Sequence, residues 1–189
     1  MVITIHQPEH FPYMGFFQKM KVADVFVVLD NVNYRKNYFQ NRNKFLNKNG
    51  VEEWFTMQVE KGSTSKHIKD VKVVEGPWKR KILTKHFQNL GINLESIYSH
   101  NKLIDINIKS IEYCRNILNI TTPIIYASDL NVKGTKSELL ANIVKNLKGT
   151  TYLSGPSGKD YLNKEYFKDI KVDFFEPKVE NYYSTLYNI

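Results

Sequence analysis

The sequence predicts an α/β domain: a mostly parallel sheet between layers of helices, with an inserted antiparallel hairpin. Residues 25–29 read VFVVL, an uninterrupted run typical of a strand that is buried on both faces. Apolar strands then alternate along the chain with segments of helical periodicity, which favours parallel strands joined by helices. Residues 54–59 and 68–74 read as two strands around a polar turn, and they predict the hairpin.

The remaining elements follow from short apolar runs and from their boundary residues. Further strands are expected over residues 2–5, 124–128, 151–153 and 172–175. Helices are expected from residue 13 to about 22, from 77 to 90, over 103–118, from 136 to 147 and over 161–167. Pro77 and Gly91 mark the ends of one helix, and Thr135 with Glu138 forms a capping box at the start of another.

Length and composition indicate one domain over residues 1–189, with a basic insert over about 34–75. A chain of 189 residues can bury a sizeable core without staples. Its one cysteine, Cys114, excludes an internal disulfide, and its place on the apolar face of a helix argues against a nucleophile. No long apolar run and no signal-peptide pattern is present, so we expect a cytoplasmic protein without a membrane span.

The net charge of +8 is concentrated in one third of the chain. Residues 31–90 contain thirteen Lys or Arg and five Asp or Glu, whereas the two signs balance outside that window. A localised positive field favours an anionic partner such as a phosphate, a nucleotide, a nucleic acid or an acidic glycan. A solvated lysine surface without a partner is the alternative.

Polar residues follow each predicted parallel strand. The strand ends carry His6-Gln7-Pro8, Asp30-Asn31, Ser128-Asp129 and the segment from Ser154 to Lys159. Ligands of open α/β sheets bind at the carboxyl ends of the strands. We therefore expect the active centre along this edge, with the segments at His6 and Ser154 side by side and facing the arginine-bearing insert.

Two histidines in the first of these segments suit proton transfer or hydrogen bonding to phosphate. His6 and His10 stand among Pro8 and Pro12, which restrict the backbone as a preorganised site requires. A structural role for either histidine is the alternative. No third ligand stands at a metal-binding spacing, so no metal site is predicted.

The stretch SGPSGK, residues 154–159, resembles a phosphate cradle because small residues and a lysine follow a strand. Ser154, Gly155, Ser157, Gly158 and Lys159 are the expected phosphate contacts. The first glycine of the nucleotide-binding P-loop is missing, so this is not a Walker motif. A tight turn with a helix cap is the alternative.

Residues 34–44, YRKNYFQNRNK, form the sharpest basic cluster. Arg42 offers a planar fork to carboxylate or phosphate, and the interleaved aromatic residues can stack on a base or a sugar. Asn41 is the neighbouring candidate for ligand binding. The same mixture occurs in nucleic-acid-binding proteins, which keeps a nucleic-acid-binding module as a second hypothesis.

Several segments together resemble the WbqC-like family of bacterial proteins. They are IHQPEHFPYMGFFQKM, ADVFVVLDNVNYRKNYFQNRNK, EWFTMQV, TYLSGPSGKDYL and VDFFEPKVENYYS, in this order. By this resemblance, the motif positions of the family would correspond to His6, Gln7, Pro8, Pro12, Gly15, Asp24, Asp30, Asn41, Arg42, Trp54, Ser154 and Gly155. Phe16 and Tyr13 depart from the family pattern without a change of charge. Members usually continue past the last tyrosine-rich motif, so we expect either a short member or a missing C-terminal element.

The resemblance implies a role in O-antigen and other surface-polysaccharide biosynthesis. One implied activity is transfer of an amino-acid or acyl group, such as glycine, to an amino sugar or nucleotide-sugar. His6 would then be the base or phosphate contact, Asp30 would orient the amine, and Arg42 would hold the donor. Gln7 and His10 would assist in binding. The donor stays open between a nucleotide such as ATP, an acyl-CoA and an aminoacyl-tRNA, and a non-catalytic nucleotide-sugar binder is a further alternative.

The opening of the chain is also similar to that of the HIGH-motif nucleotidyltransferases, which are Rossmann-like (HUP-like) proteins. In both, a strand is followed by a loop with proline and histidine and then by a helix with an early glycine. By this analogy the histidines would contact a triphosphate and Lys159 would be a second anchor. The H-x-G-H spacing itself is absent from this chain.

Overall fold

The structure is a computed structural model that describes residues 1–47, 49–84 and 94–187. Its chain divides into two compact units. The first unit comprises Met1–Gln7, Gly15–Asp30 and Ile120–Val179, and the second comprises Pro8–Met14, Asn31–Asn119 and Glu180–Ile189. The predicted insert over about 34–75 falls within the second unit, whose central segment is longer than that insert.

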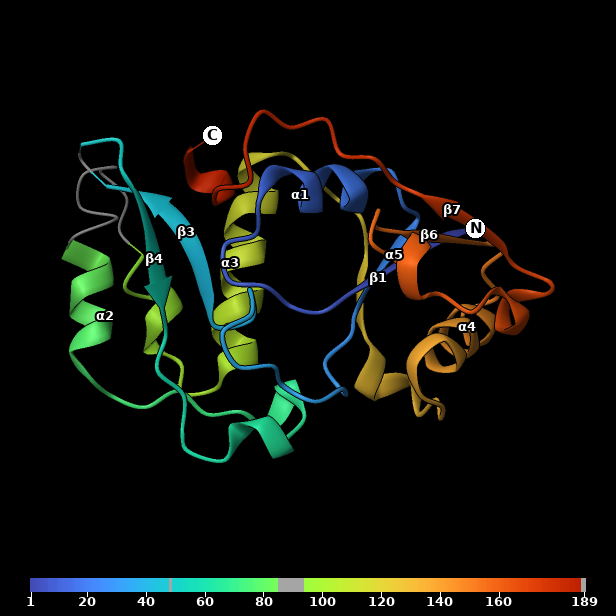
Figure 1. Ribbon diagram of the computed structural model, residues 1–189, viewed down its shortest axis with the longest axis horizontal. Coiled ribbons are helices and arrows are strands. Elements are labelled where there is room, and N and C mark those ends of the chain that lie inside the picture. The colour runs from blue at the N-terminus through green and yellow to red at the C-terminus, as the bar shows by residue number, and fades with distance from the viewer. Residues whose placement is uncertain (48, 85–93, 188–189) are drawn as a thin grey trace. The chain divides into compact units, whose positions relative to one another are not determined.

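The first unit is built on a five-stranded sheet with the order β5-β2-β1-β6-β7. The strands are β1 (Val2–His6), β2 (Val25–Val28), β5 (Ile124–Tyr126), β6 (Thr151–Ser154) and β7 (Lys171–Phe174). All four neighbouring pairs are parallel, and Figure 1 shows β1, β6 and β7 close together. The predicted α/β class with a mostly parallel sheet is confirmed.

Helices join the strands of the first unit. α1 (Met14–Lys21) links β1 to β2, and it buries Phe16, Phe17 and Met20. α4 (Lys136–Asn146) links β5 to β6 and begins at the predicted capping box of Thr135 and Glu138. α5 (Gly158–Tyr161) is a single turn between β6 and β7. Because crossovers between parallel strands are right-handed, α1 and α4 cover opposite faces of the sheet.

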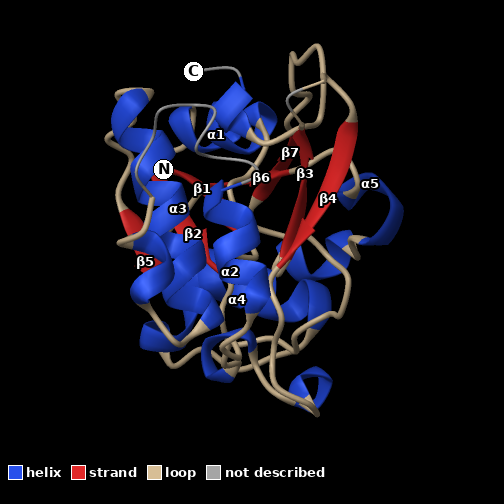
Figure 2. Ribbon diagram, turned by 90° about the vertical axis from the view of Figure 1, so that its left-hand side faces the viewer, coloured by secondary structure: helices blue, strands red, loops and turns tan. Residues whose placement is uncertain are grey.

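The second unit combines a hairpin with helices. β3 (Arg42–Leu46) and β4 (Glu52–Thr56) pair antiparallel and lie next to each other in Figure 2. α2 (Pro77–Ile82) and α3 (Leu103–Ile117) follow. The core of this unit is rich in aromatic and branched side chains, which include Phe11, Phe45, Phe55, Tyr98, Ile106 and Ile111.

The hairpin exists, but its partners differ from the expected ones. Residues 68–74 were expected to pair with residues 54–59, whereas the partner of β4 is β3. Ile68–Asp70 is a 3₁₀ turn. The predicted pairing is present only as an isolated antiparallel bridge between Val59 and Val73. In β3 the buried residues Asn43 and Phe45 alternate with partly exposed ones, a strand pattern that the asparagine- and lysine-rich composition concealed.

The other predicted helices are found with small shifts of boundary. α3 and α4 correspond to the expected helices over 103–118 and 136–147. The helix that was expected from Pro77 to Gly91 starts as α2, and its part beyond residue 84 lies outside the described residues. In place of the short helix expected over 161–167, the structure has α5, which ends at Tyr161, and a 3₁₀ turn at Lys164–Phe167.

Candidate functional site

The strand order places a topological switch point between β1 and β6. From β1 the chain proceeds through α1 to β2 on one side, and from β6 it proceeds through α5 to β7 on the other. β1 and β6 are parallel neighbours, so their carboxyl ends share one edge of the sheet. His6 ends β1, and Ser154 ends β6. Crevices at such a point are the usual ligand sites of open α/β sheets.

His6 carries a neutral imidazole in a fixed tautomer. Its Nδ1 lies 2.9 Å from the carbonyl oxygen of Gln7. Because a carbonyl oxygen can only accept, Nδ1 carries the proton and Nε2 carries the lone pair. Burial, and then the nearby charge of Lys19, lowers the pKa of His6 to about 3. The ring is therefore uncharged at neutral pH.

Lys19 lies at the same edge of the sheet and is almost fully buried. Its side chain comes from α1 and is 4% exposed. A Cβ atom on Gly155 would lie 4.0 Å from Lys19 Nζ, so the ammonium stands beside the turn that follows β6. A buried ammonium requires partners of opposite charge or hydrogen-bond acceptors. Lys19 thus places a positive charge at the switch point.

The turn after β6 is compact. Gly158 N, Lys159 N and Asp160 N donate to the carbonyl oxygens of Gly155, Pro156 and Ser157. A Cβ atom on Gly158 would lie 2.1 Å from Ser154 Oγ, so only glycine fits there. These three N–H groups are used within the turn, which favours the tight-turn alternative over a cradle of backbone donors around a phosphate.

The polar side chains of this turn have different surroundings. Ser154 is buried, and its hydroxyl makes no hydrogen bond of good geometry within the described residues. Burial raises the pKa of Tyr152, and the Ser154 hydroxyl opposes part of that shift. Lys159 is more than half exposed and pairs with Glu176 at 2.5 Å. The register of β1 and β6 sets Ser154 level with Ile5, so its side chain faces the opposite side of the sheet from His6. Lys159 is held by an acid.

Asp30 follows β2, and its carboxylate is bound locally. Its two oxygens accept from Ser128 N at 2.9 Å and from Ser128 Oγ at 2.7 Å. The side chain is 2% exposed. Because β2 and β5 are neighbours, these bonds join the carboxyl ends of the two strands. The geometry supports a structural role for Asp30 beside the predicted role in orienting an amine.

Arg42 belongs to the second unit, where it lies on β3. Its guanidinium lies 4.1 Å from the centre of the Trp54 ring, and Lys44 Nζ lies 5.4 Å from the same ring. Burial raises the pKa of the Tyr34 hydroxyl to about 12, and the charge of Arg42 lowers it in part. Arg42 Nε and Tyr34 Oη are buried without a hydrogen-bond partner in the described part of the chain.

His10 and Asn41 also belong to the second unit, and both are buried. His10 is 0% exposed and its Nε2 lies 2.9 Å from the Tyr98 hydroxyl. Asn41 is 3% exposed and donates from Nδ2 to Met57 O. Neither side chain can reach a ligand without local opening. Their burial favours structural roles over the predicted ligand contacts.

Comparison with known proteins decides the family. A sequence profile of the WbqC-like protein family matches residues 7–188. This chain belongs to the WbqC-like protein family. It is also similar to a protein of Mycobacterium tuberculosis (strain ATCC 25618 / H37Rv) named "Uncharacterized protein Rv1507c", with 25% identity over 183 residues, covering 90% of this chain and 79% of the relative. No solved structure matches it significantly.

Lys19 is the site residue of this WbqC-like chain that sequence reasoning missed. A signal was present, because Lys19 shares the buried surface of α1 with Gly15, Phe16 and Met20. A lysine inside an apolar stripe is a buried charge, which is rare unless it has a function or a partner. Of the predicted residues, the structure brings His6, Gln7, Ser154 and Gly155 to the edge shared by β1 and β6.

Two classes of site are not found within the described residues. No cluster of three or more His, Cys, Asp or Glu with metal-binding geometry occurs among them. Among the same residues, every helix is too short or too polar to cross a bilayer. Cys114 is buried, and burial raises the pKa of its thiol to about 12, which does not suit a nucleophile.

Proposed function

We propose that this WbqC-like protein is a transferase of bacterial surface-polysaccharide (O-antigen) biosynthesis. It would attach an amino-acid or acyl group, such as glycine, to an amino sugar or nucleotide-sugar. The observation that carries the proposal is the pairing of the buried Lys19 ammonium with the neutral His6 imidazole at the switch point. A buried cation at this edge suits the phosphate of a nucleotide, a nucleotide-sugar or a coenzyme A donor.

In the proposed reaction, the sugar amine attacks the carbonyl carbon of the activated acyl donor. A C–N bond forms, and the bond from that carbon to the leaving oxygen or sulfur breaks. His6 Nε2 takes the proton that the amine loses and returns it to the leaving group. Lys19, which stands beside Gly155, holds the donor's anionic part. Asp30 keeps its predicted role in orienting the amine, and the predicted role of Arg42 belongs to the second unit and is tested by itself.

Anion binding would adjust the basicity of His6. With a pKa of about 3, His6 is a weak base in the unliganded protein. An anion beside Lys19 would offset the lysine charge, which is the second cause of the lowered pKa after burial, so the pKa of His6 would rise. The donor would in this way activate the base. Cytoplasmic location follows for a protein that uses nucleotide-linked substrates.

A thermal-shift screen tests the proposal. The panel holds nucleoside triphosphates, nucleotide-sugars, acyl-CoA and aminoacyl-tRNA, because binding to the folded state raises the melting temperature. Lys19→Met should weaken binding of the stabilising compound by about tenfold or more, as expected for loss of a charged hydrogen bond. Lys21→Met is the matched control, because Lys21 is exposed on the same helix.

Turnover is measured with the same panel and an amino-sugar acceptor. His6→Gln should remove transfer while the compound still binds, and Arg42→Ala tests the separate prediction that the second unit contacts the donor. Full activity in both variants would exclude the proposed roles. Stabilisation by a nucleotide-sugar without any transfer would instead establish a non-catalytic binder.

A nucleic-acid-binding module is the second candidate, and the second unit favours it. The charge excess of residues 31–90 lies in this unit. Arg35 stacks on Tyr38 at 4.5 Å, and Arg42 stacks on Trp54 at 4.1 Å. Tyr38 and Trp54 are about two-fifths exposed, at 41% and 45%, and stacking on such rings binds single-stranded nucleic acid. Tight oligonucleotide binding that weakens steeply with salt, without response to nucleotide-sugars, would favour this function.

A further inference from the structure

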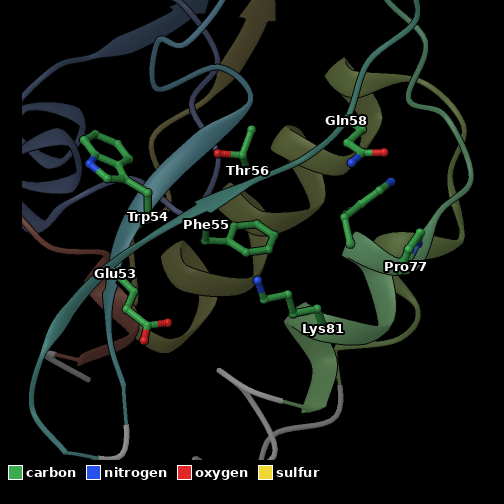
Figure 3. A pocket seen from close by; sticks show the side chains of 8 residues that line it. Glu53, Trp54, Phe55, Thr56, Gln58, Pro77 and Lys81 are labelled. Carbon is green, nitrogen blue, oxygen red and sulfur yellow. The ribbon is translucent and has the colours of Figure 1, made fainter.

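A cavity in the second unit lies between β4 and α2 and is separate from the switch point. Its volume is about 380 Å³, within the range of small-ligand sites. Phe55 and Trp78 contribute aromatic surface, and Glu53, Thr56, Gln58 and Lys81 contribute polar groups. In Figure 3 the Lys81 side chain extends from α2 towards the Phe55 ring. Trp54 and Pro77 complete the lining.

The walls of this cavity are fixed by local contacts. Trp78 Nε1 donates to Val74 O at 2.6 Å, which holds the indole in place and leaves its ring as a wall. A Cβ atom on Gly76 would lie 3.2 Å from Gln58 Oε1 and 3.2 Å from Trp78 Cδ1, so Gly76 lets these two side chains approach closely. Asn47 Nδ2 donates to Glu53 Oε1 at 2.9 Å and orients the carboxylate.

The charge of the cavity differs from that of its surroundings. Among its lining residues, Glu53 is the acid and Lys81 is the base, so the formal charges cancel. The stretch 31–90, to which all of them belong, carries an excess of eight positive charges. A phosphate or carboxylate would find better partners elsewhere on this unit and would meet the Glu53 carboxylate here. The cavity therefore does not favour an anion.

We propose that this cavity binds one neutral sugar residue of a glycan. Each sugar hydroxyl both donates and accepts, and the cavity supplies an acceptor in Glu53, donors in Lys81, and both in Gln58 and Thr56. The C–H face of a sugar ring packs on aromatic walls such as Phe55 and Trp78. A purely apolar ligand would take these polar groups out of water without replacing the hydrogen bonds that they make to water, which costs free energy.

Tryptophan fluorescence tests this inference independently of the proposed transferase activity. The chain contains two tryptophans, Trp54 and Trp78, and both lie in the second unit beside the cavity. Trp54→Phe leaves Trp78 as the sole tryptophan, whose emission is followed by exciting tryptophan selectively. The probes are methyl glycosides of glucose, galactose, mannose, rhamnose and N-acetylglucosamine. We expect a saturable change in Trp78 emission with at least one of them, and none with inorganic phosphate or glycine.

Two variants locate the binding. Gln58→Ala and Lys81→Ala should each weaken binding of the responding glycoside by about tenfold, as expected for loss of a ligand hydrogen bond. Both residues are exposed, so the fold should be retained. Lys79→Ala, two positions earlier on α2, is the matched control and should bind as the parent does. No saturable response to any glycoside, equal binding in all three variants, or a response to phosphate or glycine instead would overturn the inference.

Discussion

His10 lies in an aromatic cage of the second unit. The ring centres of Phe11 and Phe55 lie 5.0 Å away, and that of Tyr98 lies 5.8 Å away. Nδ1 of His10 is buried and has no hydrogen-bond partner among the described residues. Burial in this cage lowers the pKa of His10 to about 3, so the folded state holds the imidazole neutral. Protonation of His10 and folding of this unit therefore oppose each other.

Acid should destabilise the protein through His10. The ordinary pKa of histidine is 6.5 and the folded value is about 3, so the unfolded state binds the extra proton between these pH values. Stability is fully present above pH 6.5 and falls as pH decreases in this window, by about 1.4 kcal/mol per pH unit for one histidine. Urea unfolding of the parent and of His10→Gln, from pH 7 to pH 5, measures the slope.

In the His10→Gln variant, the free energy of unfolding should change less with pH, by about 1.4 kcal/mol per pH unit. Glutamine can keep a hydrogen bond to Tyr98 but does not titrate. His6 adds a similar dependence in the parent and in the variant, since its pKa is also about 3. His100→Gln is the control that leaves the cage intact. Identical pH slopes in all three proteins would show that His10 is not held neutral by folding.

The Asp30–Ser128 pair gives a second prediction at this scale. Ser128→Ala removes the 2.7 Å hydrogen bond to Asp30 Oδ2 while Ser128 N still donates to Oδ1. Loss of a hydrogen bond to a charged group costs about 1.5–3 kcal/mol. Chemical denaturation should show this loss in Ser128→Ala, and a change below about 0.5 kcal/mol in the exposed Ser99→Ala. If Ser128→Ala had the same free energy of unfolding as the parent, the structural role of Asp30 would be excluded.

Among the elements, the β3–β4 hairpin shows why composition misled the sequence reading. Asparagine and lysine are poor indicators of a strand, yet Asn43 occupies a buried position of β3. Its side chain pairs with backbone rather than with solvent: Nδ2 lies 3.0 Å from His10 O and 2.6 Å from Phe11 O. A buried amide that satisfies two carbonyls behaves as part of the core.

Asn43→Ala should therefore be strongly destabilising. It leaves the carbonyls of His10 and Phe11 without this donor, and each unpaired buried group costs about 1–3 kcal/mol. We expect a total loss of about 2–3 kcal/mol in urea unfolding. Asn49→Ala, in the exposed turn of the same hairpin, should change stability by less than about 0.5 kcal/mol. Equal effects of the two substitutions would show that the Asn43 contacts contribute little.

Across the whole molecule, the parallel sheet was predictable and the site was predictable only in part. The apolar run at residues 25–29 and the other short apolar runs predict strands from the local sequence alone, and packing in the folded protein favours the same strands. The neighbours β1 and β6 are separated by more than 140 residues, so their contact is not a local property. Strand order brings His6, Lys19 and Ser154 to one edge, and no pattern along the chain measures that proximity.

The division of the chain into two units was less predictable, because both units are discontinuous. Residues 8–14 contain two prolines and one histidine, which reads as a loop at a strand end. Their backbone is nevertheless part of the second unit, where Asn107 Nδ2 donates to Pro8 O and Phe11 N donates to Ser110 Oγ. Seven residues are too few to show a periodic pattern of apolar residues, so the sequence does not indicate in which of the two cores they pack.

This arrangement predicts that residues 31–119 do not fold alone. As a fragment they lack Phe11, which is fully buried, the carbonyl partners of Asn43, and Pro8 O, one of the two carbonyl partners of Asn107. We expect weak near-ultraviolet circular dichroism and poor dispersion of amide proton shifts, in contrast to the full chain. A fragment with native-like dispersion would show that residues 8–14 and 180–189 are dispensable for this unit.

The chain passes between its two units several times, and this limits which segments two related genes can exchange by recombination. Each unit is assembled from three separate stretches of sequence, so the second unit is encoded by three pieces. A single recombination event within the gene would mix mismatched pieces of both cores. Functional chimaeras between WbqC-like proteins should therefore require all three pieces of a unit from the same parent, and single-crossover libraries should yield mostly insoluble products.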